Sequence, residues 1–270
     1  MFDLSNKNII VTGAAGLLGT SFCEAILQNN GNLIAIDINE NRLKSLKKNL
    51  KKKFEKKIFT FLIDITNENA IRKNSVLLKK KFKKIDGLVN NAALNPKIRK
   101  NKSLKNNSLE SFDLKKWNQE LNVGLTGAFI CSKYYGQLIS VNTKGGTIIN
   151  ISSDLGLIAP NQSLYKNISY KNEQDYKPIT YSVIKFGIIG LTKYLSTYWS
   201  LSNVRSNAIC PGGIELDQPN IFKKRIKTLI PLNRMAKIDE YKSTLIWMLS
   251  DNTEYLNGAV IPIDGGRSAW

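Results

Sequence analysis

The chain has 270 residues, of which 42% are hydrophobic and 23% are charged. This composition supports a sizeable buried core and excludes a protein that is disordered along most of its length. No run approaches the ~18 consecutive apolar residues of a membrane span, which excludes an integral membrane protein. The first residues lack the basic start and the apolar stretch of a signal peptide, so we expect a cytoplasmic protein without a membrane partner.

The most unusual property of the sequence is its charge. Lys and Arg number 40 against 21 Asp and Glu, which gives a formal net charge of +19. Such an excess is typical of nucleic-acid-binding proteins. However, 33 of the basic residues are Lys and the chain also contains 30 Asn, and both amino acids have AT-rich codons. Codon bias explains the excess better than a DNA-reading surface, which would use more Arg, so we expect no nucleic-acid partner.

Cysteine and histidine usage limits the chemistry that a site in this chain can perform. Cys23, Cys131 and Cys210 are far apart, lack CxxC spacing and lie in apolar stretches, which predicts buried, reduced thiols. The chain contains no histidine. A catalytic triad that depends on histidine is therefore excluded, and we expect no metal site.

Short apolar runs alternate with helical patterns along the chain. The predicted strands span residues 8–12, 33–37, 59–63, 85–90, 146–151, 204–210 and 259–263. The predicted helices span residues 17–29, 40–53, 68–82, 113–140, 178–200 and 238–250. Continuous apolar strands such as Ile9-Ile10-Val11 indicate a mostly parallel sheet that is covered on both faces by helices. The alternation predicts a doubly wound α/β fold with seven strands. Because no linker divides it, we expect one domain over residues 1–270.

Three longer segments interrupt this alternation, at residues 94–112, 154–178 and 214–230. Each follows a predicted strand and therefore lies at the carboxyl edge of the sheet, where open α/β sheets bind ligands. Long loops at this edge contact substrates more often than they act as simple connections. We therefore expect these three segments to form the substrate site.

A glycine motif, Thr12-Gly13-Ala14-Ala15-Gly16-Leu17-Leu18-Gly19, joins the first predicted strand to the first helix. Its glycines let the backbone turn tightly and approach a pyrophosphate at the helix N-terminus. Asp37, at the end of the second strand, is placed to bind the adenosine ribose and to repel a 2′-phosphate. No basic residue directly follows Asp37, so we predict NAD rather than NADP. Asp64, after the third strand, either caps a helix or meets the adenine.

Tyr181 and Lys185 are four residues apart in the sequence Tyr-Ser-Val-Ile-Lys. On a helix this spacing places the phenol and the ammonium on one face. A nearby cation favours the phenolate, so we expect Lys185 to lower the pKa of Tyr181. Ser152-Ser153, directly after a predicted strand, and Asn122, within a long predicted helix, supply further polar groups.

Taken together, these residues resemble the short-chain dehydrogenase/reductase family over essentially the whole chain. The matching pieces are residues 12–19, Asp37, Asn90-Asn91-Ala92-Ala93, Asn122, Ser153, Tyr181, Lys185 and Pro211-Gly212. The resemblance implies a Rossmann fold and a nicotinamide-dependent oxidoreductase that interconverts a secondary alcohol and a ketone.

The resemblance also implies a role for each matching residue. Tyr181 is expected to be the general acid/base, and Lys185 to lower its pKa and hold the nicotinamide ribose. Ser153, rather than Ser152, is expected to orient the substrate oxygen, and Asn122 to anchor a proton-relay water. Asn90 is expected behind the cofactor, and the Ile214 backbone is expected near the carboxamide group of the nicotinamide. The implied cofactor-binding residues are Gly13, Ala15, Gly16, Leu17, Leu18, Asp37, Asp64, Ile65, Asn91, Ala92, Tyr181, Lys185, Pro211, Gly212 and Ile214.

The chain departs from the usual family pattern at three places. The middle glycine lies at position 16, one place early, and the Thr that usually follows Pro211-Gly212 is missing. Ser153 and Tyr181 are 28 positions apart, more than is usual, and the surplus is residues 164–177. This surplus and the Asp264-Gly265-Gly266-Arg267-Ser268 end resemble a subgroup of flagellin-modification oxidoreductases that occurs with surface-glycan genes. That resemblance implies a sugar, sugar phosphate or nucleotide sugar as substrate.

Basic residues are frequent in the three long segments. We expect them to converge near Tyr181 and to attract an anionic small-molecule substrate. The alternative is that they reflect only the Lys bias of the whole chain. The residues are Lys97, Arg99, Lys100, Lys102 and Lys105 in the first segment, Lys166, Lys171 and Lys177 in the second, and Lys223, Lys224, Arg225 and Lys227 in the third.

The predicted helix over residues 178–200 has apolar side chains on more than one face. A helix on the surface of a monomer would show one apolar stripe, so we expect a homo-oligomer, a dimer or tetramer. The alternative is that neighbouring helices of the same chain bury both faces.

An alternative to an enzyme is a catalytically idle, NAD-binding scaffold or regulatory protein. The presence together of Asn122, Ser153, Tyr181 and Lys185 argues against it.

Overall fold

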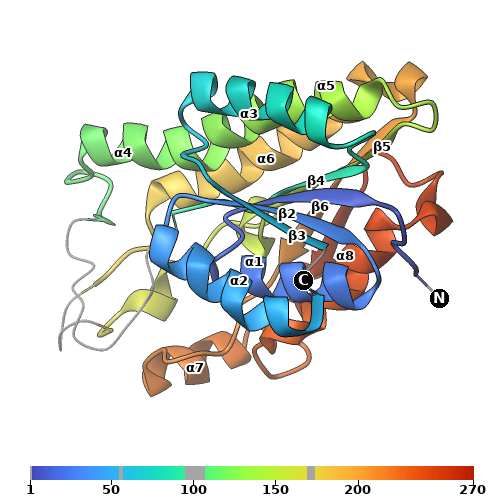
Figure 1. Cartoon of the computed structure of the whole chain (residues 1–270). Helices are drawn as coiled ribbons and strands as arrows, with labels where there is room; N and C mark the ends of the chain where they lie inside the picture. Colours follow the sequence, from blue (N-terminus) through green and yellow to red (C-terminus); the bar gives the residue numbers. More distant parts are fainter. Residues whose placement is uncertain (1, 55–56, 95–106, 169–173) are drawn as a thin grey trace.

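The centre of the computed structural model, which describes residues 2–54, 57–94, 107–168 and 174–270, is a sheet of seven parallel strands (Figure 1). Its strand order is β3-β2-β1-β4-β5-β6-β7. The strands are β1 (Asn8–Thr12), β2 (Asn32–Asp37), β3 (Ile58–Leu62), β4 (Gly87–Asn90), β5 (Gly146–Ile151), β6 (Val204–Pro211) and β7 (Val260–Ile263). The predicted doubly wound, seven-stranded sheet is confirmed, and within the described residues it is parallel throughout. The strand order reverses between β1 and β4, which is where such folds bind nucleotides.

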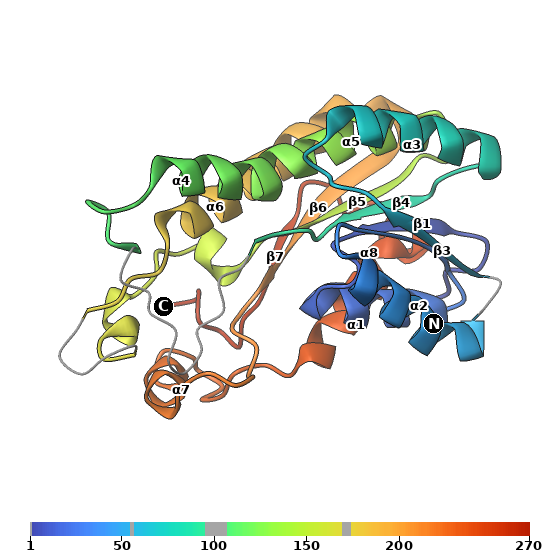
Figure 2. The same ribbon diagram turned by 60° about the vertical axis from the view of Figure 1, so that its left-hand side comes forward.

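Helices cover both faces of this sheet. The helices α1 (Leu17–Gln28), α2 (Glu40–Phe54) and α8 (Lys242–Leu249) lie on one face, and α3 (Glu68–Lys81), α5 (Gly127–Ser140) and α6 (Ile179–Tyr198) on the other (Figures 1 and 2). Successive residues of a strand point to opposite faces. In β1, Ile9 and Val11 accordingly join the core under α1, whereas Ile10 joins the core under α5.

The structure refines the predicted helix over 113–140. It consists of α4 (Leu114–Leu121), a π-helical turn (Asn122–Thr126) and α5. Such turns insert an extra residue into a helix and are frequent at functional sites. The packing around the turn is close, because a Cβ on Gly124 would lie 2.7 Å from Cγ2 of Ile184 in α6.

A third, smaller core lies beyond the carboxyl edge of the sheet. The predicted loop 214–230 contains a helix, α7 (Asn220–Lys227), and the 154–178 segment contains a 3-10 turn over Gln162–Tyr165. The two pack against each other and away from the main layers (Figure 2). Their shared core consists of Leu164, Tyr165, Ile168, Phe222, Ile226, Ile230 and Met235. The second and third long segments thus build a compact element next to the ligand-binding edge.

Candidate active site

The glycine motif forms the tight turn that its sequence predicts. Gly13 has a φ of +60°, which favours glycine, and a Cβ there would lie 2.7 Å from Cα of Ala92. A Cβ on Gly19 would lie 2.1 Å from the Gly13 carbonyl oxygen. Gly16 differs, because a Cβ there would meet only the Gly13 oxygen, at 3.1 Å, and otherwise open space. The loop is therefore closed on the protein side and open on the side where a ligand would approach.

The N-terminus of α1 fits a pyrophosphate. Its N-cap is Gly16, which supplies no side-chain hydrogen bond, and its first turn contains no acidic residue. The first backbone N–H groups of a helix, here including those of Leu17 and Leu18, have no partner within the helix. They can therefore bind an anion, which the helix dipole also stabilises.

Asp37 is fixed beside this loop. One of its carboxylate oxygens accepts a hydrogen bond from the Ala15 N–H at 2.8 Å, and the other accepts one from the Asn39 N–H at 2.8 Å. Asn91 braces the opposite side, since its amide donates to the carbonyl oxygens of Thr12 and Gly13 at 3.1 and 3.0 Å. The end of β2 and the end of β4 thus hold the glycine loop between them.

Asp64 shapes the turn that leads into α3. Its carboxylate accepts hydrogen bonds from the N–H and the hydroxyl of Thr66, at 2.9 and 2.8 Å, while Asn67 is the N-cap of α3. The side chain of Ile65 is buried against Gly127 of α5.

Asn90, at the end of β4, is also buried, and its amide donates to Ser132 and Asn150 at 3.0 and 2.8 Å. Asn90 therefore joins the sheet to α5 and lies in the core, behind the open edge.

The structure brings Ser153, Tyr181 and Lys185 together where β5 ends against α6. The Lys185 ammonium donates to the Ile151 carbonyl oxygen at 2.8 Å, and the Ser152 hydroxyl donates to the Lys185 carbonyl oxygen at 2.7 Å. These two bonds attach the end of β5 to α6. Ser152 belongs to this junction between β5 and α6, whereas the Ser153 hydroxyl is a hydrogen-bond partner of the Tyr181 phenol, so Ser153 is the better candidate for a substrate contact.

Asn122 begins the π-helical turn that packs against α6. Its carbonyl oxygen accepts the backbone N–H of Gly127. Its side chain is exposed and forms no hydrogen bond to another residue that the structure describes. The turn lies beside α6, one residue of which, Ile184, directly precedes Lys185.

The electrostatics of Tyr181 correct our expectation from the sequence. Burial raises the pKa of Tyr181 to about 12, and the Ser153 hydroxyl, as a hydrogen-bond partner, opposes that rise. Burial also lowers the pKa of Lys185 to about 8. The Lys185 ammonium lies 5.8 Å from the ring centroid and is bonded to a backbone carbonyl. The prediction that Lys185 brings the Tyr181 pKa below its ordinary value is therefore wrong for this arrangement, because the cost of burying a phenolate is larger.

A buried ion pair that was not predicted from the sequence adjoins the candidate serine. The Ser153 hydroxyl donates to one oxygen of Asp154 at 2.7 Å, and Arg267 donates to the other at 2.6 Å. Both charged side chains are buried. Asp154 follows the serine pair directly, but its partner lies 113 positions away, so only the fold shows the contact.

The C-terminal segment forms the turn that presents Arg267. The Asp264 carboxylate accepts the N–H groups of Gly266 and Ser268, each at 2.9 Å. Gly265 and Gly266 have φ angles of +69° and +89°. These angles explain the Gly-Gly pair, because side chains at those positions would be strained.

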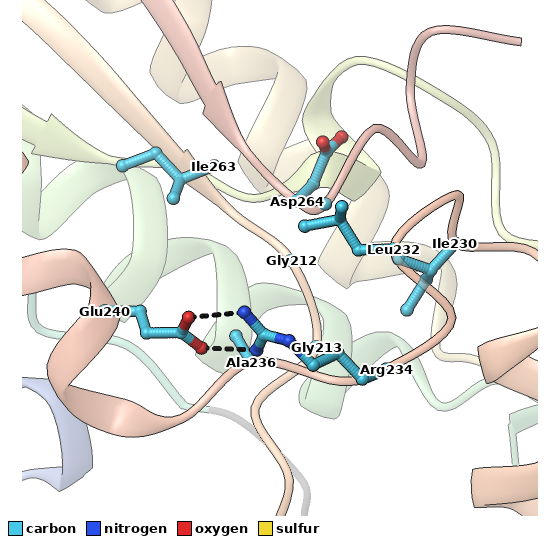
Figure 3. Close-up of a pocket in the computed structure, with 10 residues that line it drawn as sticks. Gly212, Gly213, Ile230, Leu232, Arg234, Ala236, Glu240, Ile263 and Asp264 are labelled. Atoms are coloured by element: carbon cyan, nitrogen blue, oxygen red, sulfur yellow. Dashed lines mark hydrogen bonds and ion pairs between the residues drawn. The ribbon is translucent and has the colours of Figure 1, made fainter.

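A pocket of about 100 Å³ lies beside Pro211-Gly212 (Figure 3). It is lined by Gly212, Gly213, Ile230, Leu232, Arg234, Ala236, Glu240, Ile263, Asp264 and Gly265. Arg234 and Glu240 form a bidentate pair at 2.6 and 2.7 Å, and this contact lowers the pKa of Glu240 to about 2. Ile214 follows the glycines, and its carbonyl oxygen accepts the Gln218 amide at 2.8 Å.

Three of the six described cations of the long segments have partners within the protein. Lys223 and Lys227 lie 3.5 and 4.0 Å from the Glu215 carboxylate. Arg225 donates to the carbonyl oxygens of Ser163, Leu164 and Lys166, which ties α7 to the 154–178 segment. These three residues stabilise the small third core. The predicted residues Lys97, Arg99, Lys100, Lys102, Lys105 and Lys171 lie outside the described residues.

Three general features complete the description. Cys23, Cys131 and Cys210 are buried and free, as predicted. Within the described ranges, no group of three or more His, Cys, Asp or Glu side chains is placed to hold a metal ion. In the same part of the chain, no helix combines the length and apolar character needed to cross a membrane.

Known proteins resemble this chain over nearly its full length. The family model described as enoyl-(acyl carrier protein) reductase matches residues 13–268. Post-translational flagellin modification protein A of Campylobacter coli is 32% identical over 263 residues, covering 97% of this chain and 98% of that protein. The 3-oxoacyl-[acyl-carrier-protein] reductase FabG of Thermotoga maritima is 28% identical over 267 residues, covering 97% and 98%.

Solved structures agree with this placement. The short chain dehydrogenase of Leptospira borgpetersenii with bound NAD+ superposes with a TM-score of 0.81 at 26% identity, covering 98% of this chain and 94% of that one. A gluconate 5-dehydrogenase from Burkholderia cenocepacia, in complex with NADP and tartrate, shares the fold with a TM-score of 0.84 at 20% identity, covering 100% and 98%. The chain therefore belongs to the short-chain dehydrogenase/reductase family of NAD(P)-dependent oxidoreductases.

Proposed function

We propose that this protein is an NAD-dependent oxidoreductase that interconverts a secondary alcohol and a ketone on an anionic, sugar-type substrate. The observation that carries this proposal is the meeting of Ser153, Tyr181 and Lys185 at the end of β5. They lie at the same edge of the sheet as the open glycine loop and the uncapped N-terminus of α1.

The proposed chemistry assigns one task to each of these side chains. In the reductive direction, the Tyr181 hydroxyl donates its proton to the substrate carbonyl oxygen while the carbonyl carbon accepts a hydride; oxidation is the reverse. The nicotinamide, when bound, supplies or accepts that hydride. The Ser153 hydroxyl holds the same substrate oxygen. Lys185 keeps a positive charge near the phenol, and Asn122 anchors a proton-relay water at the π-helical turn.

We propose NAD as the cofactor because Asp37 lies against the glycine loop, where it would repel a 2′-phosphate. The relatives with solved structures include one with NAD+ and one with NADP, so the family alone does not choose between them. The backbone of Ile65, rather than its buried side chain, is the part that can face the nucleotide. The other proposed contacts are Gly13, Ala15, Gly16, Leu17, Leu18, Asp64, Asn91, Ala92, Tyr181, Lys185, Pro211, Gly212 and Ile214.

The proposed substrate class, a sugar, sugar phosphate or nucleotide sugar of surface-glycan biosynthesis, is supported by the likeness to a flagellin modification protein. The test is hydride transfer, followed by NADH absorbance, with a panel of sugar phosphates and nucleotide sugars and with neutral ketones as the control. Turnover that is fastest on a charged sugar and falls with ionic strength supports the proposal. A neutral ketone as best substrate contradicts it, and NAD binding without any turnover would favour an idle scaffold.

We also propose a cytoplasmic, single-domain protein that forms a homo-oligomer through α6. Val183, Phe186, Tyr194 and Tyr198 of this helix are exposed, while Ile184, Ile188 and Leu195 are buried against the same chain. A Cβ on Gly190, in the middle of the exposed stripe, would meet no atom within 4 Å. An apolar stripe with a small residue at its centre fits a second helix that packs closely.

A further inference from the structure

Lys177 lies directly on the candidate catalytic tyrosine. Its ammonium is 3.7 Å from the centroid of the Tyr181 ring, closer than the Lys185 ammonium at 5.8 Å. Lys177 belongs to the surplus segment between Ser153 and Tyr181, and its side chain is half-buried. The cation thus comes from a part of the chain that makes this protein longer here than its family pattern.

No carboxylate of the described residues contacts the Lys177 ammonium. Among the described residues it makes no hydrogen bond and no ion pair, and only the tyrosine ring contacts its charge. The nearby carboxylates are already bonded, because Asp154 is held by Arg267 and Ser153, and Glu120 accepts the Thr180 hydroxyl. Neither of these carboxylates contacts the Lys177 ammonium, and burying a cation without a directly paired anion is unfavourable. By contrast, Lys223 and Lys227 of α7 share the carboxylate of Glu215.

The position of Lys177 is set by its backbone. Its N–H donates to the Gln162 side chain at 3.1 Å, and the Gln162 carbonyl oxygen accepts the Gln174 amide at 2.9 Å. Pro178 follows as the N-cap of α6. The two ends of the segment are therefore tied together, and the lysine is held where it emerges beside Tyr181.

We propose that Lys177 is a substrate-binding residue whose ammonium pairs with a carboxylate or phosphate group of the substrate, close to the reacting carbon. Tyr181 must meet the substrate oxygen in the proposed reaction, so an anion on Lys177 lies within a few ångströms of that oxygen. This inference rests on the proposed function, which it deepens by naming the residue that selects for charge. Burial lowers the pKa of Lys177 to about 8, while Asp154 and Glu120 raise it and Arg267 lowers it. A bound anion offsets the cost of burial and keeps the ammonium charged.

The test compares Lys177→Gln with two controls. Lys177→Arg keeps the charge, and Lys166→Gln removes an exposed lysine from the same segment. The probes are matched pairs, namely a sugar phosphate with its parent sugar and a 2-keto acid with its amide. Binding to the protein with NAD present is measured by calorimetry in a Tyr181→Phe background, which cannot turn over. Binding thus stays measurable even if the proposed reaction is wrong.

We expect Lys177→Gln to weaken binding of the anionic member of at least one pair by about tenfold or more, the size of a lost charged hydrogen bond. The neutral member should bind equally well to both proteins, and Lys177→Arg and Lys166→Gln should retain anion binding. The pair that responds identifies the anion as phosphate or carboxylate. Equal losses for charged and neutral members, no loss for any probe, or no anion binding by the parent protein would each overturn the inference. If Lys177 acted only on the phenol, Lys177→Gln in the native enzyme would lower kcat without this change in binding.

Discussion

Replacing Arg267 by methionine leaves the Asp154 carboxylate buried without its ion pair. Breaking a buried pair from one side costs about 3–5 kcal/mol of unfolding free energy. Asp154 would keep the Ser153 hydroxyl and the Leu155 N–H, at 2.7 and 2.8 Å, so we expect the lower end, about 3 kcal/mol. In a chain of this size that corresponds to a fall in Tm of about 6–12 °C.

The assay is urea unfolding of Arg267→Met, Asp154→Asn and the double variant, with extrapolation to water. The double variant should recover part of the loss, because it contains neither unpaired charge, and the cycle gives the coupling energy. Glu40→Gln, which breaks the exposed pair with Lys44, is the control and should cost less than about 1 kcal/mol. An Arg267→Met protein as stable as that control, or losses that simply add, would refute the reasoning.

The same two variants should move the pH dependence in opposite directions. Asp154 raises and Arg267 lowers the pKa of Tyr181. Alcohol oxidation requires the phenolate, so its kcat/KM rises with pH up to the tyrosine pKa. Arg267→Met should therefore shift this rise to higher pH, and Asp154→Asn to lower pH. The other ionisable groups around the ring, Tyr165, Lys177, Lys185 and Tyr241, are unchanged in both variants, so shifts in one common direction would contradict the assignment.

Three further predictions address the cofactor, the oligomer and the buried lysine. Asp37→Ala should weaken NADH binding and strengthen NADPH binding in fluorescence titrations, because the carboxylate that repels a 2′-phosphate is gone; unchanged preference would contradict its role. Gly190→Arg should reduce the mass measured by light scattering while Gly190→Ala should not, since only the arginine fills the space over the exposed α6 stripe. Burial holds the Lys185 pKa at about 8 against 10.5 in its ordinary range, so the folded state binds fewer protons between these values. The unfolding free energy of the native protein, relative to Lys185→Met, should therefore rise from pH 8 to pH 10.5 and stay level below that window.

Much of the fold could be predicted because local patterns of apolar and polar residues determine where its strands and long helices form. Strands β1 and β2 contain continuous apolar runs, and the predicted bounds of all seven strands lie within two residues of those observed. Helix α7 was missed because it has only eight residues, too few for a helical period to stand out beside its Lys and Arg. The π-helical turn was missed because packing against Ile184 fixes it, and that contact is not local in sequence.

The candidate site also contains residues that the sequence predicts and contacts that only the fold reveals. Ser153, Tyr181 and Lys185 could be found because their spacing matches a family pattern. The partner of Asp154 could not be found, because a contact across 113 positions depends on the fold. The sequence shows that a cation lies near Tyr181, but not how deeply the phenol is buried, and burial decides the direction of its pKa. Lys177 was expected among many basic residues, and only the structure distinguishes it, by placing its ammonium 3.7 Å from the centroid of the Tyr181 ring.

The turn over residues 264–270 connects two parts of the structure that the sheet does not join. Arg267 contacts Asp154 beside the candidate serine, and the indole N–H of Trp270 donates to the Leu229 carbonyl oxygen at 3.3 Å. Figure 2 shows this end of the chain beside α7. A movement of α7 would therefore reach the Ser153 hydroxyl through one short turn and one buried ion pair.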